Sequence, residues 1–132
     1  AAPASLRRHG TPQHPTDLAR HNCLSFGTGV NQSRGWLFAI DGKTTPQRVS
    51  GTLECTDGAV LHAWTLDGRG LAWRSLWEIE DDLKEGRLVT VLDEFAAPPN
   101  AIYAVYPQRK HLPLRVRVFI DMLRQSYAKR LP

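Results

Sequence analysis

The spacing of apolar and polar residues at the start of the chain predicts a short helix followed by a short strand. Proline at a first helical position and Gly10 past the end are typical of a helix over residues 3–9. Thr16 or Asp17 can cap a single helical turn, and the run NCLSF at 22–26 then predicts a strand.

A hairpin is predicted next. The apolar residues 36–40 predict a strand, and Asp41-Gly42 is a strong signal for a hairpin turn. Residues 48–55 alternate between apolar and polar side chains after a turn at Pro46, so they are the expected partner strand.

The middle of the chain predicts helices that alternate with strands. Asp57 or Thr56 can cap a helix that ends near Leu66, and Gly68 supplies the left-handed residue that follows. Apolar residues populate one side of this helix, namely Ala59, Val60, Ala63, Trp64 and Leu66.

The alternation continues with a short strand at 71–73, a helix over 76–84 that Ser75 caps and Gly86 ends, and a strand at 88–92. Strands that alternate with helices in this way imply a parallel sheet covered by helices.

A Gly-x-Gly at 68–70 invites comparison with nucleotide-binding loops. In a dinucleotide fingerprint the glycines lie between a strand and the helix whose N-terminus holds the phosphate. Here they follow a helix and precede a strand, so they lie at the carbonyl end of the helix, where an anion is repelled. The order of elements therefore indicates a tight helix-to-strand turn.

The last third of the chain predicts one strand and one long helix after a linker. Prolines exclude helix from 93–100, residues 101–106 predict a strand, and Pro113 opens the helix. One face of this helix is apolar, with Val116, Phe119, Ile120, Leu123 and Tyr127 at helical spacing. A lone strand leaves its backbone hydrogen-bonding groups unpaired, and a lone amphipathic helix exposes its apolar face to water. We therefore expect self-association of the chain or exchange of this unit between copies.

Composition excludes some classes of function. The chain has 132 residues, a formal charge of +4 and a pI of about 9.4, yet its arginines and lysines are scattered, which indicates a solvated basic surface. No apolar run is long enough for a membrane span, and the residues AAPASLRRHG lack the charged-then-apolar order of a signal peptide, so we expect no membrane targeting. Cys23 and Cys55 lie in apolar runs without metal-binding spacing, which favours buried, reduced thiols and a cytoplasmic protein.

Catalytic and metal-binding patterns are weak. His62 lies five residues after Asp57, which puts the two side chains on different faces of a helix, and no nucleophile elbow occurs. The histidines are dispersed and form no HxxxH or HExxH pair. We therefore expect no enzyme, no metal and no cofactor.

Segments spread over nearly the whole chain resemble, in order and spacing, the effector-binding region of LysR-type transcriptional regulators. They are APASL with Gly10, DLARHNCLSF, DGAVLHAWTLDGRGLAWRS, DLKEGRLVTVL, and the closing AIYAVYP with RVRVFIDML. The resemblance implies an α/β fold of the type 2 periplasmic-binding-protein kind, in which two subdomains joined by crossing strands bind a small molecule in the cleft between them.

Mapped onto that fold, residues 1–94 resemble the second subdomain, and residues 95–132 resemble the crossover and the C-terminal part of the first. The family's N-terminal helix-turn-helix and the front half of the first subdomain are not matched, so we expect a fragment of a bacterial regulator. The resemblance implies a dimer or tetramer that contacts promoter DNA only through the missing domain.

Ligands of open α/β sheets lie beyond the carboxyl ends of the strands and at helix N-termini. Residues at such places are the candidates for effector binding: Phe26, Gly27, Thr28, Thr56, Asp57, Trp73, Arg74 and Asn100. Arg74 is the sharpest, because an arginine can clamp the carboxylate of a small organic acid with two hydrogen bonds.

Each candidate also has a purely structural interpretation. Arg74 can form a salt bridge with Glu78 or Glu80, and Thr56 and Asp57 can be plain helix caps. The tryptophans at 64 and 77 are better explained as core or subunit-contact residues than as ligand stackers.

Two other functions stay open. A solute-binding protein that feeds a transporter shares the fold that the resemblance implies. A small basic nucleic-acid-binding protein would instead use the positive surface, and its affinity would fall steeply with salt.

Overall fold

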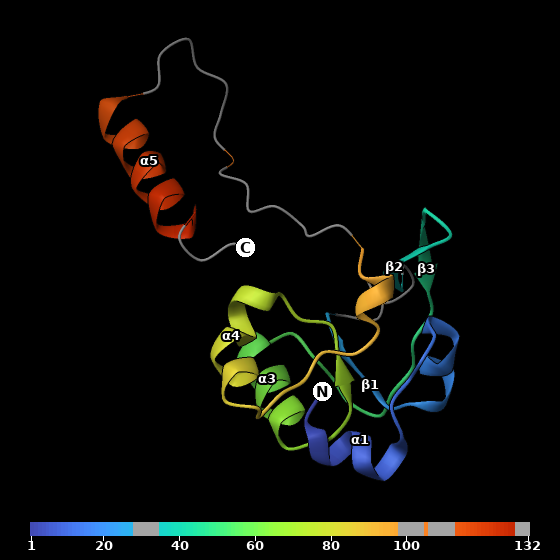
Figure 1. Cartoon of the computed structure of the whole chain (residues 1–132). Helices are drawn as coiled ribbons and strands as arrows, with labels where there is room; N and C mark the ends of the chain where they lie inside the picture. The colour runs from blue at the N-terminus through green and yellow to red at the C-terminus, as the bar shows by residue number, and fades with distance from the viewer. Residues whose placement is uncertain (28–34, 98–104, 106–112, 129–132) are drawn as a thin grey trace. The chain divides into compact units, whose positions relative to one another are not determined.

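The structure is a computed structural model that describes residues 1–27, 35–97, 105 and 113–128. The chain divides into two compact units, Ala1–Pro99 and Asn100–Pro132 (Figure 1). The predicted loop residue Thr28, the strand at 101–106 apart from Val105, and Asn100 lie outside the described residues.

A parallel sheet forms the centre of the first unit. β1 (Cys23–Phe26) lies between β4 (Glu54–Cys55) and β5 (Leu71–Ala72), and both neighbours run parallel to it. The predicted parallel α/β arrangement is thus confirmed. Because β4 and β5 have two residues each, contacts beside the ladders must help to hold the sheet together.

Asn22, the residue immediately before β1, makes such contacts. The Oδ1 atom of Asn22 accepts a hydrogen bond from Thr52 N (2.8 Å), and its Nδ2 atom donates to the carbonyl oxygen of Arg69 (2.7 Å). A Cβ at Gly51 or Gly70 would lie 2.0 or 2.2 Å from the carbonyl oxygen of Cys23 or Asn22. Glycine at both positions lets the flanking segments approach the start of β1 this closely.

The N-terminal helices agree with the sequence pattern except for one cap. α1 (Pro3–His9) has proline at its first turn, and Gly10 follows it with φ +82°. The next turn is the 3₁₀ helix η1 (Pro15–Arg20), whose N-cap is His14 rather than the predicted Thr16 or Asp17. Asp17 instead accepts hydrogen bonds from the backbone N–H groups of Gln13 and His14, which lower the pKa of its carboxyl group.

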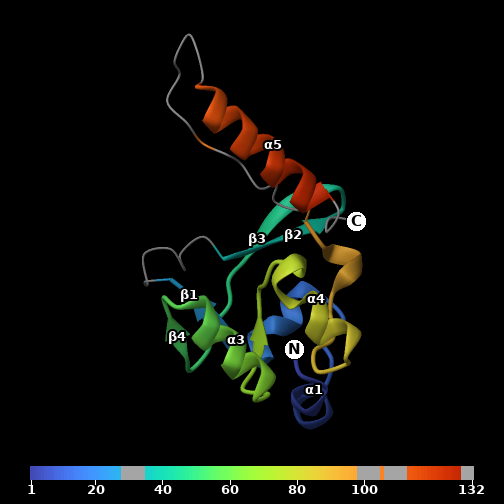
Figure 2. The same cartoon turned by 90° about the vertical axis from the view of Figure 1, so that its left-hand side faces the viewer.

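Two helices follow β4 and β5 in the chain (Figures 1 and 2). α3 (Gly58–Leu66) is capped by Asp57, whose Oδ1 atom accepts from Ala59 N (2.7 Å) and Val60 N (3.2 Å). This confirms the predicted helix and its cap. Helix α4 (Leu76–Lys84) begins after Ser75, as predicted, although the Ser75 side chain makes no capping hydrogen bond.

The buried face of α3 differs from the predicted one. Leu61 and Thr65 point into the core, whereas Ala59, Val60 and Ala63 are exposed. The apolar residues of this helix surround it on several sides, so their spacing alone does not select the buried face. Thr65 is accommodated in the core because its hydroxyl group donates to the carbonyl oxygen of Leu61 (2.7 Å).

The hairpin is present, but its second strand is not the predicted one. β2 (Trp36–Ile40) pairs antiparallel with β3 (Lys43–Gln47), directly after the turn at Asp41-Gly42. Both turn residues have positive φ (49° and 73°), as a tight two-residue hairpin turn requires.

The predicted partner strand at 48–55 is therefore wrong. Pro46 pairs with Leu37 inside β3, which is possible because, among the strands that the structure describes, β3 pairs with β2 alone. Of residues 48–55, only β4 is a strand, and it pairs with β1 instead.

Two further predictions fail after α4. Residues 88–92 form no strand: Val89 exchanges hydrogen bonds with Ala1 in both directions, but α1 begins at Pro3 and ends the extended pairing. The linker at 93–100 contains the 3₁₀ helix η2 (Asp93–Phe95), which lies before the two prolines that were expected to exclude helix.

The core of the first unit has two clusters. Leu18, Cys23, Phe38 and Leu71 form one, with Phe95 packed against it. The other contains Ala2, Ile79 and Leu88, and it joins α1 to α4. Cys23 is fully buried, and burial raises the pKa of its thiol to about 11.

The second unit contains α5 (Leu114–Ala128), the long helix predicted after Pro113. Most of the predicted apolar face is half-buried, as Val116, Ile120, Leu123 and Tyr127 show, but Phe119 is 56% exposed. Val105 is fully exposed and is not in a strand.

Asn22→Ala should lower the free energy of unfolding by about 1 to 3 kcal/mol, because it removes the hydrogen bonds to the Thr52 N–H and to the Arg69 carbonyl group, each worth roughly 0.5 to 1.5 kcal/mol. Gln13→Ala is the matched control, since its amide makes only a local, exposed hydrogen bond to Thr11. Urea unfolding measures both. Equal, small effects of the two substitutions would contradict the role given to Asn22.

Cys23 and Cys55 should differ sharply in reactivity. At neutral pH a maleimide should modify the half-buried Cys55 first and leave Cys23 unmodified until the chain unfolds, because Cys23 is inaccessible and its pKa is high. Intact mass against time measures this. In Cys55→Ser the first addition should vanish, and rapid modification of that variant in its folded state would disprove the expectation.

Candidate functional site

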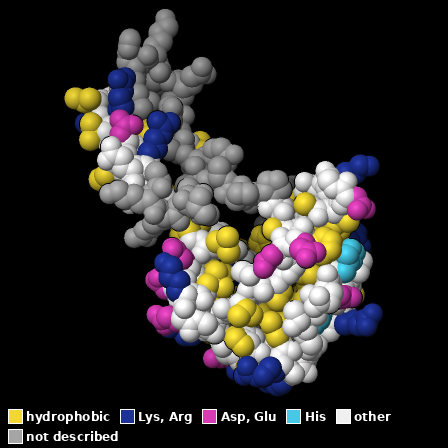
Figure 3. All heavy atoms as spheres, in the orientation of Figure 1, with side chains coloured by type: hydrophobic (Ala, Val, Ile, Leu, Met, Phe, Trp, Pro, Cys, Tyr) yellow, Lys and Arg dark blue, Asp and Glu magenta, His cyan; other side chains and the backbone are white. Residues whose placement is uncertain are grey.

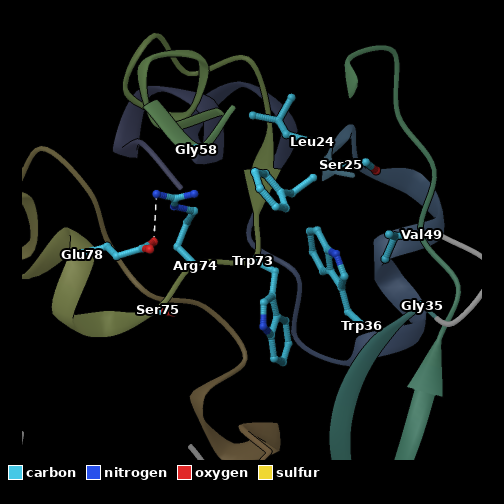
Figure 4. A pocket seen from close by; sticks show the side chains of 11 residues that line it. Leu24, Ser25, Gly35, Trp36, Val49, Gly58, Trp73, Arg74, Ser75 and Glu78 are labelled. Atoms are coloured by element: carbon cyan, nitrogen blue, oxygen red, sulfur yellow. Dashed lines mark ion pairs between the residues drawn. The ribbon is translucent and has the colours of Figure 1, made fainter. Parts of the chain in front are cut away.

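A hollow of about 390 Å³ opens at the carboxyl ends of the parallel strands (Figure 4). Its wall on the β1 side is made by Leu24, Ser25 and Phe26. The segments after β4 and β5 supply the first residue of α3, Gly58, and the residues that lead into α4. This is the edge of an α/β sheet at which ligands are expected.

An aromatic wall forms one part of the hollow. Trp73 follows β5, and its ring lies 6.0 Å from the ring of Trp36 and 5.4 Å from that of Phe38, the latter edge-to-face at 88°. Trp73 remains 42% exposed despite these contacts. The first strand of the hairpin thus holds the indole in place while leaving part of it open to a ligand.

The polar part of the hollow centres on Arg74. Its side chain is only 13% exposed, and its Nη2 atom lies 2.8 Å from Glu78 Oε2, four residues later on α4. The Nε atom is buried and has no hydrogen-bond partner among the described residues. A Cβ at Gly58 would lie 3.5 Å from Nη1, so the guanidinium group lies next to the first residue of α3.

In Figure 4 the polar and apolar walls lie apart. Arg74 and Glu78 are on one side of the view, and Trp36 and Val49 are on the other, with Trp73 between them. The arrangement can therefore receive a molecule that carries an anionic group at one end and a flat apolar surface at the other.

The structure brings together three of the candidates that the sequence singled out, namely Phe26, Trp73 and Arg74. Thr56 and Asp57 are exposed and do not line the hollow, and Asp57 serves as the cap of α3. Gly27 does not line it either, and its backbone N–H donates to the carbonyl oxygen of Cys55 (2.8 Å). Thr28 and Asn100 lie outside the described residues.

The salt bridge that the sequence offered as an alternative role for Arg74 is also present, and its partner is Glu78. The two interpretations are compatible, since a guanidinium group has five N–H donors and Glu78 uses only part of them. Trp64 is half-buried and Trp77 is 42% exposed, and neither lines the hollow.

Sequence reasoning missed several lining residues. Trp36 begins the first hairpin strand, whose range was predicted correctly but without a role in a site. Val49 lies in the segment after the hairpin, which the incorrect pairing had placed in a strand. Ser25, Gly58 and Ser75 each stand beside a residue that was singled out, so the rule about strand ends and helix starts would have found them if it had been applied one residue more widely. Glu78 was expected only as a salt-bridge partner of Arg74.

Other polar clusters do not form a site. His62 Nε2 lies 2.9 Å from Asp82 Oδ2, and Arg87 Nε lies 2.6 Å from the Oδ1 atom of the same carboxylate, so His62 pairs with Asp82 and not with Asp57. Among the described residues no group of His, Cys, Asp and Glu side chains is arranged to hold a metal ion. No helix in the described part of the chain is long and apolar enough to cross a membrane.

Comparison with known sequences identifies relatives over the full chain. The model of the LysR substrate binding domain matches residues 1–128. The transcriptional regulator DmlR of Escherichia coli K12 is 35% identical over 132 residues, which are 100% of this chain and 43% of DmlR. The regulator CrgA of Neisseria meningitidis (strain 8013) is 33% identical over 99% of this chain and 44% of its own length.

Solved structures of LysR-type regulators also match this chain. The regulatory domain of CrgA matches with a TM-score of 0.75 at 32% identity, over 93% of this chain and 60% of that domain. Full-length AphB, a virulence activator of Vibrio cholerae, matches with a TM-score of 0.76 at 26% identity, over 99% of this chain and 43% of AphB.

The chain thus spans less than half the length of these curated relatives. The predicted fold of the type 2 periplasmic-binding-protein kind is confirmed by the structural matches. On the family match over residues 1–128, the chain belongs to the LysR substrate-binding domain family.

Proposed function

We propose that this chain is the effector-sensing part of a LysR-type transcriptional regulator and that the hollow beside Arg74 receives part of the effector. The observation that carries the proposal is the buried, unpartnered Nε atom of Arg74 at the edge of the sheet. The relatives, which are transcriptional regulators, support it.

The effector is proposed to be a small organic acid. A guanidinium group binds a carboxylate through parallel N–H hydrogen bonds. Arg74 lines the same hollow as the aromatic wall, and its buried Nε donor has no partner among the described residues. Binding would select one arrangement of the sensing domain over another and involve no catalysis. No cofactor enters this proposal.

The remaining parts of the regulator are also proposals. Residues 1–94 would belong to the second subdomain of the family fold and residues 95–132 to the crossover and the first. Promoter DNA would be contacted by a helix-turn-helix domain of the whole protein, in the cytoplasm, and the sensing domains would assemble as a dimer or tetramer.

The rival functions receive less support. A solute-binding protein would share the fold, but the relatives are transcriptional regulators. Direct nucleic-acid binding would need a concentrated positive surface. Figure 3 instead shows lysine and arginine side chains spread around the visible face of the first unit, with acidic side chains between them.

Arg74→Gln should abolish binding of small acids. Thermal shift with acetate, succinate and benzoate, and with neutral benzamide as a shape control, tests this. The acid that binds should stabilise the wild-type chain by about 2.7 kcal/mol at one hundred times its Kd and leave Arg74→Gln unmoved, since only the wild type offers the guanidinium group.

Arg69→Gln is the matched control, because Arg69 is an exposed arginine on the turn before β5, where it pairs with Asp67. It should bind like the wild type. If benzamide stabilises the chain as well as benzoate does, or if Arg74→Gln keeps the response, the proposed anion site is refuted.

Self-association should depend on the exposed apolar residues of α5. Val118, Phe119 and Met122 are each more than half exposed, and burial between copies would stabilise an oligomer. Sedimentation should show an oligomer for the wild-type chain and a shift toward monomer for Phe119→Glu. Gln125→Glu, which adds the same charge at an exposed polar position, is the control. A monomeric wild-type chain at high concentration would contradict this.

A further inference from the structure

The sequence at the start of α4 has a pattern that its structure does not use. Ser75, Leu76, Trp77 and Glu78 fit the S-x-x-E capping box, in which the glutamate turns back and accepts a hydrogen bond from the backbone N–H of the serine. In the structure the Ser75 side chain makes no capping hydrogen bond, and the Glu78 carboxylate contacts Arg74 at 2.8 Å.

The same chain forms a complete capping box elsewhere. At η1 the His14 side chain and the Asp17 carboxylate satisfy each other's backbone N–H groups. At α4, Arg74 competes for the carboxylate that would complete the corresponding arrangement. Glu78 therefore has two alternative partners within its reach, the guanidinium group of Arg74 and the N-terminus of its own helix.

The pair that is formed leaves Arg74 incompletely satisfied. Glu78 contacts it through Nη2, while the buried Nε atom has no partner among the described residues. A buried donor without an acceptor is costly, and a carboxylate that approaches in the plane of the guanidinium group can bind two of its N–H groups together. Glu78 reaches the group from the following turn of chain and supplies one short contact.

We propose that Glu78 is an internal counter-ion that the carboxylate of the effector displaces from Arg74, and that the released Glu78 then caps α4 by accepting from the backbone N–H of Ser75. This inference rests on the proposed function, because it assigns a partner exchange to the same hollow. It makes Glu78 a residue that tunes affinity for acids and links occupancy of the hollow to α4.

Helix α4 connects Glu78 to the hydrophobic core. Glu78 precedes Ile79, which is buried in the cluster that contains Ala2 and Leu88. A change in the first turn of α4 therefore acts on a helix that is fixed to the core at the next residue. Negative charge at a helix N-terminus is favourable, so the displaced carboxylate gains a partner there.

Glu78→Gln tests the exchange, with Glu80→Gln as the matched control. Glu80 lies on the same helix, loses the same charge on substitution and pairs with Lys84 away from the hollow. Removing the competitor for Arg74 should make benzoate bind about fivefold tighter to Glu78→Gln, which is the scale of a partly exposed ion pair. Glu80→Gln should bind it like the wild type, as measured by calorimetry.

Amide hydrogen exchange at Ser75 supplies a second readout that does not depend on affinity. Saturation with benzoate should slow exchange of the Ser75 N–H in the wild-type chain, because Glu78 then accepts from it. In Glu78→Gln the slowing should be smaller, since a neutral amide is a weaker acceptor. Near-UV circular dichroism checks that both variants keep their packing.

The outcomes separate the two proposals. If the wild type and Glu78→Gln bind benzoate equally, or if the variant binds it more weakly, the exchange is overturned while the anion site stands. If Ser75 exchange is unchanged on saturation, the capping part is overturned. If neither chain binds benzoate, acetate or succinate, the exchange falls together with the proposed function.

Discussion

Two long-range hydrogen bonds of the Asn22 side chain, to the backbone of Thr52 and of Arg69, are the interactions on which the rest of the first unit depends. They join the segment before β4 and the segment before β5 to the start of β1, across 30 and 47 residues of sequence. The outer strands have two residues each, so their backbone hydrogen bonds to β1 alone cannot fix the positions of the segments that follow them. Gly58, Trp73 and Arg74 emerge from these strands at the other edge, and their positions follow from this anchoring.

The helices were predicted well because single residues in the sequence determine where each helix starts and ends. Proline at the start of α1, Asp57 before α3 and the glycines at 68 and 86 act on the backbone next to them, whatever the rest of the chain does. Strand pairing was predicted less well. Residues 48–55 alternate like a partner of β2, yet the turn at Asp41-Gly42, with positive φ at both residues, reverses the chain at once, so residues 43–47 pair with β2 instead.

The site was predicted only in part for a related reason. Residues that follow parallel strands were found because every such strand ends at the same edge of the sheet, which is how Phe26, Trp73 and Arg74 were recognised. Trp36 comes from an antiparallel hairpin, and no rule of strand order brings it to that edge. Its place depends on ring packing against Trp73, a tertiary contact that no periodicity in the sequence encodes.

The packing of Trp73 between the hairpin and the hollow has an optical consequence. Of the four tryptophans in the chain, Trp36 and Trp73 line the hollow, and their rings lie 6.0 Å apart. Whatever occupies that space changes the polarity around two indoles at once. The chain therefore contains its own spectroscopic reporter, whose emission responds to the contents of the hollow without an attached dye.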